Sequence, residues 1–552
     1  MSASAPKASL AAAVKIASTA SETQPVKLLF KKGSVFEGNA TFEGYQSTNA
    51  FPLILDSYGE GEGYPKFVGT GSETTKNTID AVLYFKDDNV WVKNLEVTGP
   101  TAYQGIAFQP SSGGAFENIL VEGNYVHDIN FVWNYDTKPS ETSPDNIDVE
   151  SVCPKGDDGT GRYVYRKYSA ICLDNDYTRA PAWFENVWIR NNRVENVGKI
   201  GINVYNRWNN KGGVGYGYNK YVDGTETYND ESKGLGNYPH KNVYVTGNYL
   251  SCCGGDGLVV SGATGGKVNK NVSYYANYLG RTGYYNAGIW VFACTGTVVE
   301  YNEAAYTYMR NGGQDAQGFD IDNACRNIIF RYNYAHHNEG GGLLLCNNTT
   351  TIDKYDQNGG LTASNVSVQG DWGDNYIYGN VFAYNGKASD SGLSAFITVA
   401  RAANDAYIYN NTVVMSGEIK EQNIVNVEAA GCTNHYYYNN LFYSETANGA
   451  KFNLSSTMAY RFDGNLFYNV TTSGISSQYN LDAVSYDPEL TGLGGLSTED
   501  FNGFEALSFF VPENLNVSVG GSALPEKALA AKSGEDALGN KAGDTHIGAL
   551  VR

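Results

Sequence analysis

The sequence predicts an all-β protein built as one parallel β-solenoid, and three observations carry this prediction. Among 552 residues there are 64 Gly and 43 Tyr but only 4 Met and 14 Pro, a composition that favours short strands and tight turns. Short β-branched or aromatic runs recur roughly every 20 to 30 residues. Many runs lead into a Gly-Asn, Tyr-Asn or Asn-Asn pair, and Asn and Gly tolerate the left-handed backbone of a sharp corner.

The repeat is clearest between residues 242 and 345. Its units are NVYVTGNYLSCCGGDGLVVSG, VSYYANYLGRTGYYNAGIWVFAC, VVEYNEAAYTYMRNGGQDAQGFDIDNAC and IIFRYNYAHHNEGGGLLLC. Each begins with a short strand, passes through a corner and ends, after a Gly, in a second short strand. Similar units precede and follow, so roughly ten repeats of two or three strands predict a solenoid rather than a sandwich or a propeller. Asn side chains at equivalent corners are expected to stack as an amide ladder.

The N-terminal segment, residues 1–27, is expected to hold a capping helix. The stretch SLAAAVKIA, Ser9 to Ala17, has an N-cap Ser followed by helix formers with apolar spacing, which suits a short amphipathic helix over one end of the solenoid. The apolar run in this region is broken by Ser and Thr, so no signal peptide is visible in this chain.

Charge and motif content exclude several classes of function. The chain has 39 Lys plus Arg against 58 Asp plus Glu, a net charge of −19, which argues against a nucleic-acid partner. No apolar run is long enough for a membrane helix. The eight Cys show no metal-ligand spacing and are expected to be buried small side chains. Phosphate-binding and dinucleotide motifs are absent, so no organic cofactor is expected.

The repeats resemble those of the right-handed parallel β-helix superfamily of carbohydrate-active proteins, which is pectate-lyase-like in architecture. The stretch GGQDAQGFDIDNACRNIIFRYNYAHHNEGGGLLLC is similar to a block in bacterial β-helix glycoside hydrolases, and the ending DPELTGLGG to DTHIGALVR resembles their C-terminal closing segment, here from about residue 486. The resemblance implies a single-domain right-handed parallel β-helix over residues 28–552, and a secreted or periplasmic bacterial enzyme. The ordered motifs of polygalacturonases are absent, which disfavours that class.

Aligning the repeats on the Gly that opens the second strand separates inward from outward side chains. This alignment places Leu258–Ser261 over Ile289–Phe292, Phe319–Asp322 and Leu343–Cys346. Two of the four resulting columns are wholly apolar and are therefore expected to point into the solenoid, because side chains alternate faces along a strand. The outward columns then contain, in order, Val259, Trp290, Asp320 and Leu344, and Ser261, Phe292, Asp322 and Cys346. Extending the alignment backward adds Asn203, Tyr205 and Asp174 to this face.

Two aromatic residues one coil before two carboxylates form a pattern expected of a sugar-binding groove. Aromatic rings stack on sugars, and carboxylates act as acid, base or nucleophile in glycoside hydrolysis. We predict Asp320 and Asp322 as the catalytic core, with Asp315 or Glu339 supplying or replacing the general acid. The residues predicted to bind substrate are Trp290, Phe292, Asp256, His337, Tyr205, Asn203 and Arg310.

Strand geometry leaves the stereochemistry open. Two residues apart on one strand, Asp320 and Asp322 have Cα atoms roughly 6.5 to 7 Å apart, compatible with the wider carboxyl separation of inverting glycosidases. A pair in adjacent coils, such as Asp322 and Glu339, would instead suit the closer separation of retaining enzymes.

Two other functions compete with hydrolysis. A polysaccharide lyase, with Ca²⁺ as a possible cofactor, would use a basic or Tyr side chain for β-elimination, but the outward strand positions contain no Lys or Arg to meet an anionic substrate. A non-catalytic carbohydrate-binding β-helix would account for the aromatics and leave the Asp pair unexplained. The expected partner is an oligo- or polysaccharide from plants, algae or a host, bound by a monomer.

Three insertions interrupt the repeat, near residues 131–168, 209–240 and 349–373. The second, rich in Gly and Tyr, is expected to be a loop that walls the groove, since long loops in compact domains often serve function.

Overall fold

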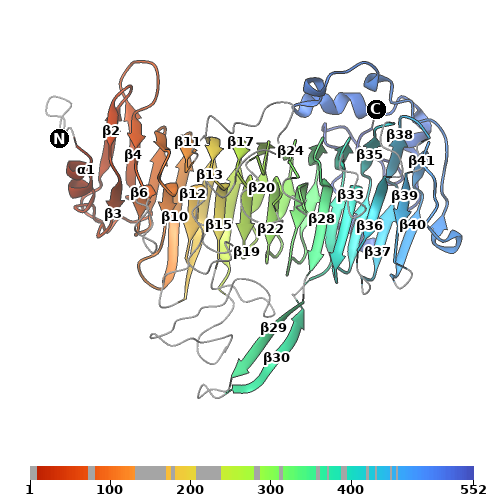
Figure 1. Ribbon diagram of the computed structural model, residues 1–552, viewed down its shortest axis with the longest axis horizontal. Helices are drawn as coiled ribbons and strands as arrows, with labels where there is room; N and C mark the ends of the chain where they lie inside the picture. The colour runs from red at the N-terminus through yellow and green to blue at the C-terminus, as the bar shows by residue number, and fades with distance from the viewer. Residues whose placement is uncertain are drawn as a thin grey trace.

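The computed structural model of the protein shows a right-handed parallel β-helix, as the sequence predicts (Figure 1). It describes residues 9–71, 81–130, 169–175, 181–206, 238–278, 286–309, 315–347, 349–355, 361–369, 372–386, 394–417, 422–428, 432–447, 450–455 and 458–551. None of the helices in these ranges is long and apolar enough to cross a membrane.

Each coil contributes one strand to each of three parallel sheets that run the length of the solenoid. Over the described residues the first sheet has 15 strands, the second 13 and the third 12. The first sheet comprises β1 (Lys27–Lys31), β4 (Leu53–Tyr58), β7 (Val90–Lys93), β10 (Gly114–Glu122), β13 (Ala182–Arg190), β16 (His240–Thr246), β19 (Ala263–Thr264), β20 (Lys267–Asn269), β23 (Val298–Glu300), β26 (Ile329–Arg331), β31 (Asn375–Tyr378), β34 (Ala406–Tyr409), β37 (His435–Tyr438), β40 (Tyr460–Asp463) and β42 (Asn480–Leu481).

The other two sheets follow the first in chain order within each coil. The second comprises β2 (Val35–Glu37), β5 (Lys66–Val68), β8 (Glu96–Gly99), β11 (Tyr125–Ile129), β14 (Arg193–Val197), β17 (Tyr249–Cys253), β21 (Val272–Tyr274), β24 (Glu303–Ala305), β27 (Tyr334–His336), β32 (Val381–Ala383), β35 (Thr412–Met415), β38 (Leu441–Ser444) and β41 (Leu466–Tyr468). The third comprises β3 (Ala40–Phe42), β6 (Ala81–Phe85), β9 (Gln104–Phe108), β12 (Ser169–Asp174), β15 (Ile200–Tyr205), β18 (Leu258–Ser261), β22 (Ile289–Phe292), β25 (Gln317–Ile321), β28 (Gly341–Asn347), β33 (Ser394–Arg401), β36 (Asn423–Val427) and β39 (Lys451–Asn453).

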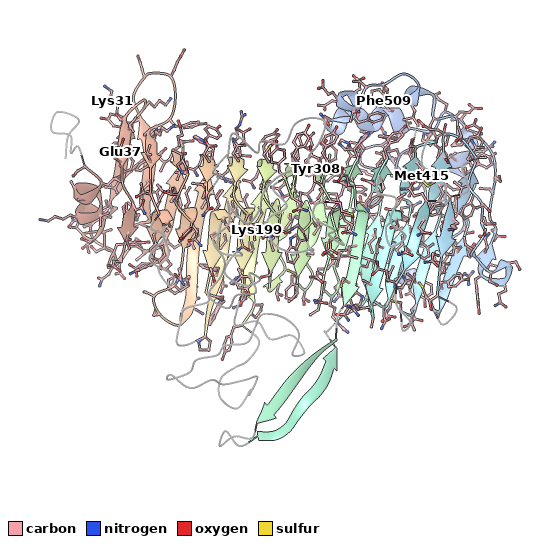
Figure 2. The ribbon with its side chains drawn as sticks, viewed as in Figure 1. Lys31, Glu37, Lys199, Tyr308, Met415 and Phe509 are labelled. Carbon is pink, nitrogen blue, oxygen red and sulfur yellow. The ribbon has the colours of Figure 1, made fainter. Side chains whose placement is uncertain are left out.

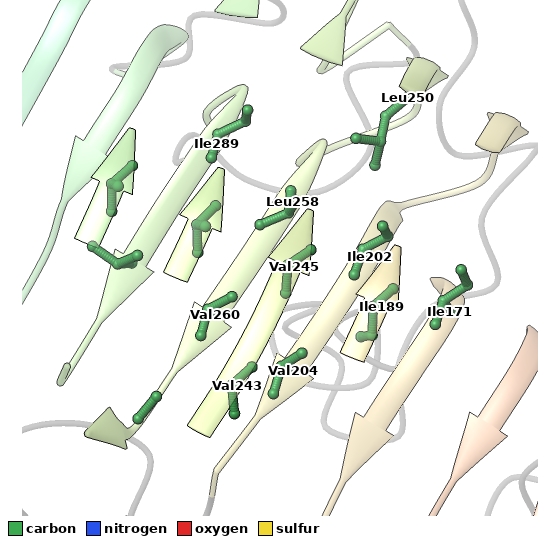
Figure 3. Close-up of a cluster of buried hydrophobic side chains, with 14 of the residues drawn as sticks. Ile171, Ile189, Ile202, Val204, Val243, Val245, Leu250, Leu258, Val260 and Ile289 are labelled. Carbon is green, nitrogen blue, oxygen red and sulfur yellow. The ribbon is translucent and has the colours of Figure 1, made fainter. Parts of the chain in front are cut away.

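Aliphatic side chains from all three sheets fill the interior of the solenoid. In the central coils, Ile189 and Val245 of the first sheet, Leu250 of the second and Ile202 and Leu258 of the third point toward one another and are fully buried (Figure 3). Because side chains alternate across each strand, every second residue belongs to this core and the intervening residues face outward.

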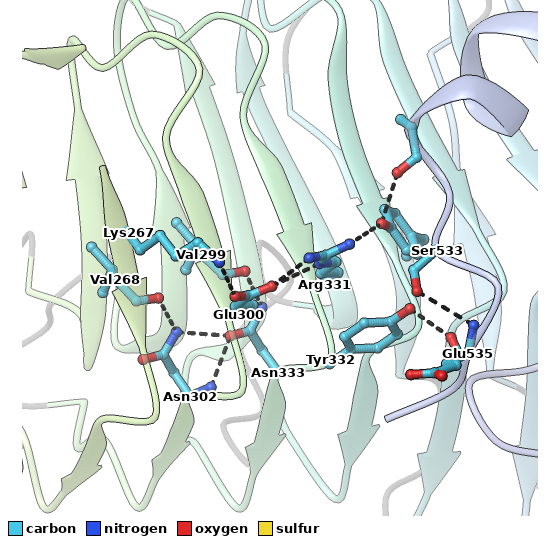
Figure 4. Close-up of polar contacts among 12 residues, drawn as sticks. Lys267, Val268, Val299, Glu300, Asn302, Arg331, Tyr332, Asn333, Ser533 and Glu535 are labelled. Carbon is cyan, nitrogen blue, oxygen red and sulfur yellow. Dashed lines mark hydrogen bonds and ion pairs between the residues drawn. The ribbon is translucent and has the colours of Figure 1, made fainter. Parts of the chain in front are cut away.

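An amide ladder forms the corner between the first and second sheets, as expected. Asn302 accepts hydrogen bonds at its Oδ1 from the backbone N–H and the side-chain amide of Asn271, at 3.0 and 2.9 Å. Its own amide donates to Asn333 Oδ1 at 2.9 Å and to the Val268 carbonyl at 2.8 Å (Figure 4). The same pattern runs through Asn124, Asn192, Asn248, Asn271, Asn302, Asn333, Asn380, Asn411, Asn440 and Asn465.

The residue before each ladder Asn has the left-handed backbone. Gly247 and Tyr301, for example, have φ of 66° and 54°. This explains the Gly-Asn and Tyr-Asn pairs of the sequence: the first residue turns the chain, and the Asn that follows satisfies the backbone groups of the turn.

The predicted helix caps the N-terminal end of the solenoid. It is α1 (Leu10–Ala17), whose N-cap Ser9 accepts a hydrogen bond from the N–H of Ala12 at 3.3 Å. Its apolar face packs Leu10, Ala13 and Ala17 onto the first coils, so the open end of the core is covered.

The C-terminal segment folds back over the outside of the last coils (Figure 1). It contains the 3₁₀ helices η4 (Ser477–Tyr479), η5 (Thr491–Leu493), η6 (Thr498–Phe501), η7 (Phe504–Phe510) and η8 (Leu515–Ser518), and then α3 (Glu526–Ala531). Phe501 and Phe510 pack against the second sheet, and the Tyr332 hydroxyl donates to the Glu535 carbonyl at 2.6 Å (Figure 4).

Of the three insertions, the structure describes mainly the last. The strands β29 (Thr349–Tyr355) and β30 (Leu361–Gln369) pair as an antiparallel ribbon, which projects from the solenoid (Figure 1). Residues 131–168 and 207–237 lie outside the described residues, and the proposed wall of the groove lies among them.

Candidate functional site

The outer face of the third sheet carries the aspartates, in the register that the repeats predict. Trp290 of β22 pairs with Asp320 of β25, and Asp320 pairs with Leu344 of β28. Phe319 and Ile321, on either side of Asp320, are fully buried in the core. Asp320 therefore points outward, and Asp322, whose N–H donates to the Val291 carbonyl at 2.9 Å, follows on the same face.

The carboxyl group of Asp320 is almost completely buried. Its exposed fraction is 8%, and within the described part of the chain its Oδ1 has no hydrogen-bond partner. Burial, and then the neighbouring charges of Asp322, Asp315 and Asp256, raise the pKa of Asp320 well above its ordinary value. A protonated carboxyl is the form that this environment favours.

Asp315 joins the same cluster from the corner that precedes β25. Burial raises its pKa well above the ordinary value, and Asp322, Asp256 and Glu428 add to the rise. Unlike Asp320, it is partly exposed. The next coil runs against its backbone: a Cβ on Gly340 would lie 1.9 Å from the Asp315 carbonyl oxygen, so Gly is needed there for this corner to close.

Asp322 is the other partly exposed carboxylate of the cluster. Its Oδ1 accepts a hydrogen bond from the N–H of Asn323 at 2.7 Å. The Cys346 thiol, one coil later, is buried and also hydrogen-bonds to Asp322, and its pKa is raised by burial and by the charges of Asp322, Asp320 and Asp315. Hydrogen bonds donated to a carboxylate favour its ionised form.

Apolar side chains flank the aspartates on both sides along the solenoid. On the N-terminal side, Trp290 and Phe292 belong to a buried cluster with Val259. On the C-terminal side, Leu344 and Cys346 pack with Ala400. These two clusters account for the desolvation that dominates the pKa shifts of Asp315 and Asp320.

Trp290 and Phe292 face outward but are not open platforms. Their exposed fractions are 7% and 5%, and their rings meet edge to face with centroids 6.3 Å apart. The indole N–H of Trp290 donates to Asp256 Oδ1 at 3.1 Å. The two rings therefore form an apolar wall beside the aspartates.

Asp256 has a supporting position in the coil before Trp290. Besides the indole, its Oδ1 accepts from the N–H of Ala287 at 3.1 Å, and its Oδ2 lies 3.7 Å from Nζ of Lys199. Lys199 is buried, donates to Asn286, and lies near the middle of the solenoid (Figure 2). It packs over Gly255, where any Cβ would come within 2.5 Å of its Nζ.

The remaining predicted binding residues fall in three different places. Asn203 and Tyr205 occupy the outward columns of β15, with 2% and 4% exposure, and Asn203 pairs with Val259. Asn203 is three coils before Asp320, or about 14 Å along the solenoid. Arg310 lies outside the described residues.

The structure places His337 away from the aspartates. It follows β27 in the second sheet, where its ring stacks on Tyr306 and Tyr384 and contacts Phe501 of the C-terminal segment. Glu339 lies in the corner that follows His337, and its Oε2 accepts a hydrogen bond from the N–H of Met309 at 2.8 Å. Its charge is not among those that raise the pKa of Asp315 or Asp320.

The sequence alone did not identify two charged residues at this face, Lys199 and Glu428. Lys199 lies in a corner rather than in a strand, so the alignment of outward strand positions passed over it. Glu428 directly follows β36, and its charge reaches Asp315. The outward alternation of Asn426 and Glu428 around Val427 was the signal that could have revealed Glu428.

Comparisons with known proteins agree with the fold. The family described as a right-handed β-helix region matches residues 169–358. A lacto-N-biosidase of Bifidobacterium longum subsp. longum is 23% identical over 81% of this chain, and the chain spans 28% of the length of that relative.

The solved structures to which this chain is similar include enzymes of different kinds. A lacto-N-biosidase of glycoside hydrolase family 136 from Eubacterium ramulus is 18% identical, with a TM-score of 0.46 over 83% of this chain and 65% of that chain. An alginate lyase from Paenibacillus sp. strain FPU-7 is 12% identical, with a TM-score of 0.36 over 82% of this chain and 98% of that chain.

Proposed function

We propose that the chain is a glycoside hydrolase in which Asp315 is the general acid and Asp322 is the second catalytic carboxylate. The observation that carries this proposal is the pairing of two partly exposed aspartates, one of which has a strongly raised pKa, on an outer face framed by apolar side chains. The lacto-N-biosidase relative supports hydrolysis of a glycosidic bond over the two alternatives raised by the sequence.

The different environments of the two carboxyl groups give them different catalytic roles in this proposal. Asp315 stays protonated to a higher pH than an ordinary carboxyl, so it can donate a proton to the glycosidic oxygen as the bond breaks. Asp322 accepts hydrogen bonds from Asn323 and Cys346, which favours the carboxylate needed to attack the sugar or to activate water. Environments that move the pKa values of two carboxyls apart in this way are typical of enzymes that use one carboxyl as the acid and the other as the base or nucleophile.

Asp320 does not contact the substrate in this proposal. It lies between Trp290 and Leu344 with 8% exposure, so it has little access to a substrate. Its raised pKa favours the protonated, neutral form, and its charge is not among those that raise the pKa of Asp315. The sequence-based choice of Asp320 and Asp322 as the core thus becomes Asp315 and Asp322, with Asp320 behind them.

A neutral glycan is the proposed substrate class. A net charge of −19 and a carboxylate cluster both repel anionic polymers. The name of the relative makes lacto-N-biosides the first compounds to test. Because two carboxyls supply acid and base, we propose hydrolysis without a metal ion, so activity is expected to persist in EDTA.

The decisive experiment compares two variants on two kinds of leaving group. Asp315→Asn should lower kcat by about 100-fold or more on natural oligosaccharides but much less on p-nitrophenyl glycosides, whose leaving group needs no proton. Asp322→Asn should abolish turnover of both. Equal activity of the unaltered enzyme and the two variants would contradict these assignments. An unsaturated product absorbing in the ultraviolet would indicate a lyase.

A further inference from the structure

The outer face of the third sheet changes character across the aspartates. On the N-terminal side, the column of Asp320 contains Val259 and Trp290, which are apolar and at most 7% exposed. On the C-terminal side, beyond Leu344, the same column continues with the polar residues Thr398, Asn426 and Asn453. The register therefore places apolar residues in the two coils directly before Asp320 and polar residues from the second coil after it, whereas Asn203, three coils before Asp320, is the next polar residue of the column on the N-terminal side.

The polar residues after Asp320 are built into the sheet. Ile397, Val399 and Val425, adjacent in the strands to Thr398 and Asn426, are fully buried in the core. Asn453 donates a hydrogen bond from its Nδ2 to Asn426 Oδ1 at 2.6 Å. At about 4.8 Å per coil, Asn426 lies about 14 Å along the solenoid from Asp320.

Glu428 lies two residues after Asn426 on the same face, in the neighbouring outward column, which also contains Asp322. Its N–H donates to the Val399 carbonyl at 2.9 Å, which keeps it in register beyond the end of β36. The side chain is exposed, its charge acts on Asp315, and the guanidinium of Arg401, at the end of β33, acts on it in turn. Arg401 is also exposed.

The two exposed side chains, Glu428 and Arg401, match the chemistry of sugar hydroxyls, whereas Asn426 is 2% exposed and accepts from Asn453. A carboxylate accepts two hydrogen bonds, and a guanidinium donates several in a fixed fork. Adjacent ring hydroxyls present both donors and acceptors, and the opposite charges of Glu428 and Arg401 suit a neutral partner. The apolar wall of Trp290 and Phe292 offers no such groups on the other side.

We propose that Glu428 and Arg401 form a sugar-binding subsite, and that the bound glycan runs from the aspartates toward the C-terminal coils. The inference rests on the proposed function, because it places the part of the glycan that lies beyond the cleaved bond.

The test measures binding and turnover separately. Calorimetric titration of free lacto-N-biose and a panel of neutral oligosaccharides into Asp322→Asn protein gives Kd without hydrolysis. Adding Glu428→Gln should weaken Kd about tenfold, the effect of losing a charged hydrogen bond. In the otherwise unchanged enzyme, at a pH low enough that Asp315 is protonated in both proteins, Glu428→Gln should raise KM about tenfold and change kcat by less than about twofold.

Glu445→Gln is the matched control, because Glu445 is exposed on the second sheet and accepts a hydrogen bond from the Tyr384 hydroxyl that Gln can also accept. It should leave Kd and KM unchanged. Thermal melting of both variants checks that each is folded.

The outcomes separate this inference from the proposed function. Turnover with unchanged KM and Kd in Glu428→Gln overturns the subsite and leaves the hydrolase intact. Binding that depends on Glu428, without turnover of any glycan, supports the subsite and removes the hydrolase. A change confined to the pH profile would make Glu428 an electrostatic neighbour of Asp315 only, and failure of every neutral glycan to bind also overturns the subsite.

Discussion

The indole N–H of Trp290 donates a hydrogen bond of 3.1 Å to Oδ1 of Asp256, whose other oxygen faces the buried ammonium of Lys199. One carboxylate thus ties the aromatic wall of the site to a charge in the corner of the preceding coils. In Asp256→Asn the amide oxygen still accepts from the indole, but Lys199, whose side chain is 7% exposed, loses its counter-charge.

We therefore expect Asp256→Asn to lower the free energy of unfolding by about 3 kcal/mol, because the ammonium of Lys199 loses its ion-pair contact with Asp256 at a buried position. Urea unfolding followed by Trp fluorescence measures this change. The control is Lys527→Met, which breaks the exposed pair with Asp374 and should cost less than about 1 kcal/mol. Equal effects of the two substitutions would contradict the buried-pair assignment.

The raised pKa of Asp320 predicts a stability that falls as pH rises. Below the ordinary pKa of 3.8 the carboxyl is protonated in both folded and unfolded chains. Above it, the unfolded chain loses the proton while burial keeps it on the folded chain, so unfolding becomes progressively easier. Asp320→Asn, which mimics the protonated acid, should therefore raise Tm at pH 7 and leave it nearly unchanged at pH 3.

Asp500 supplies a control of opposite sign. It accepts hydrogen bonds from the backbone and hydroxyl of Ser497, which lower its pKa, so its contribution is lost as pH falls. Asp500→Asn should lower Tm near neutral pH. A lower Tm in Asp320→Asn at pH 7 would show that Asp320 is ionised in the folded protein.

The pH dependence of turnover should follow Asp315. As a general acid it acts only when protonated, so kcat is expected to decline as pH rises through its raised pKa. Glu428→Gln removes one of the negative charges that raise this pKa, so the alkaline limb should move to lower pH. Rate profiles of both proteins on one natural oligosaccharide measure the shift, and a move to higher pH would contradict the assignment.

The amide ladder predicts a large loss of stability from one substitution. Asn302→Ala removes two donated and two accepted hydrogen bonds at a fully buried position. The partners left behind include a backbone N–H and a carbonyl, and the expected loss is about 3 to 5 kcal/mol in chemical denaturation. The exposed Asn242, which has a left-handed backbone, provides a control: Asn242→Gly should cost less than about 1 kcal/mol.

Buried histidines predict destabilisation in mild acid. Burial lowers the pKa of His435 to about 4, while its carbonyl partner Ala403 opposes the shift only partly. Between about pH 6.5 and pH 4 the unfolded chain therefore binds a proton that the folded chain does not, and stability falls as pH falls. His435→Gln should reduce the slope of unfolding free energy against pH in this window by about 1.4 kcal/mol per pH unit.

His127 tests the sign of that effect. Burial opposes protonation of His127, but hydrogen bonds with Asp128 and Glu96 prevail and raise its pKa. Its contribution is thus present at low pH and lost as pH rises, so His127→Gln should change the slope in the opposite direction to His435→Gln. Identical slope changes would refute the assignment of both residues.

Much of the architecture followed from the repeat alone. Each coil repeats the same alternation of apolar and polar positions, and parallel pairing of equivalent positions is the arrangement that buries every apolar column together. Trp290, Asp320 and Leu344 are paired as the alignment predicts, and the Asn corners form the expected ladder. Local sequence pattern was enough here because each strand of the solenoid pairs only with the equivalent strands of neighbouring coils.

The chemistry of the site was decided by tertiary structure. Asp315 and Lys199 lie in corners, where no strand alternation indicates direction, and Glu428 comes from a coil more than 100 residues away from Asp315. His337 follows the same repeat as the site residues, yet the returning C-terminal segment covers it with Phe501. The sequence by itself determined which strand residues face outward; packing between distant segments decided which of them are desolvated, and therefore which carboxyls hold a proton.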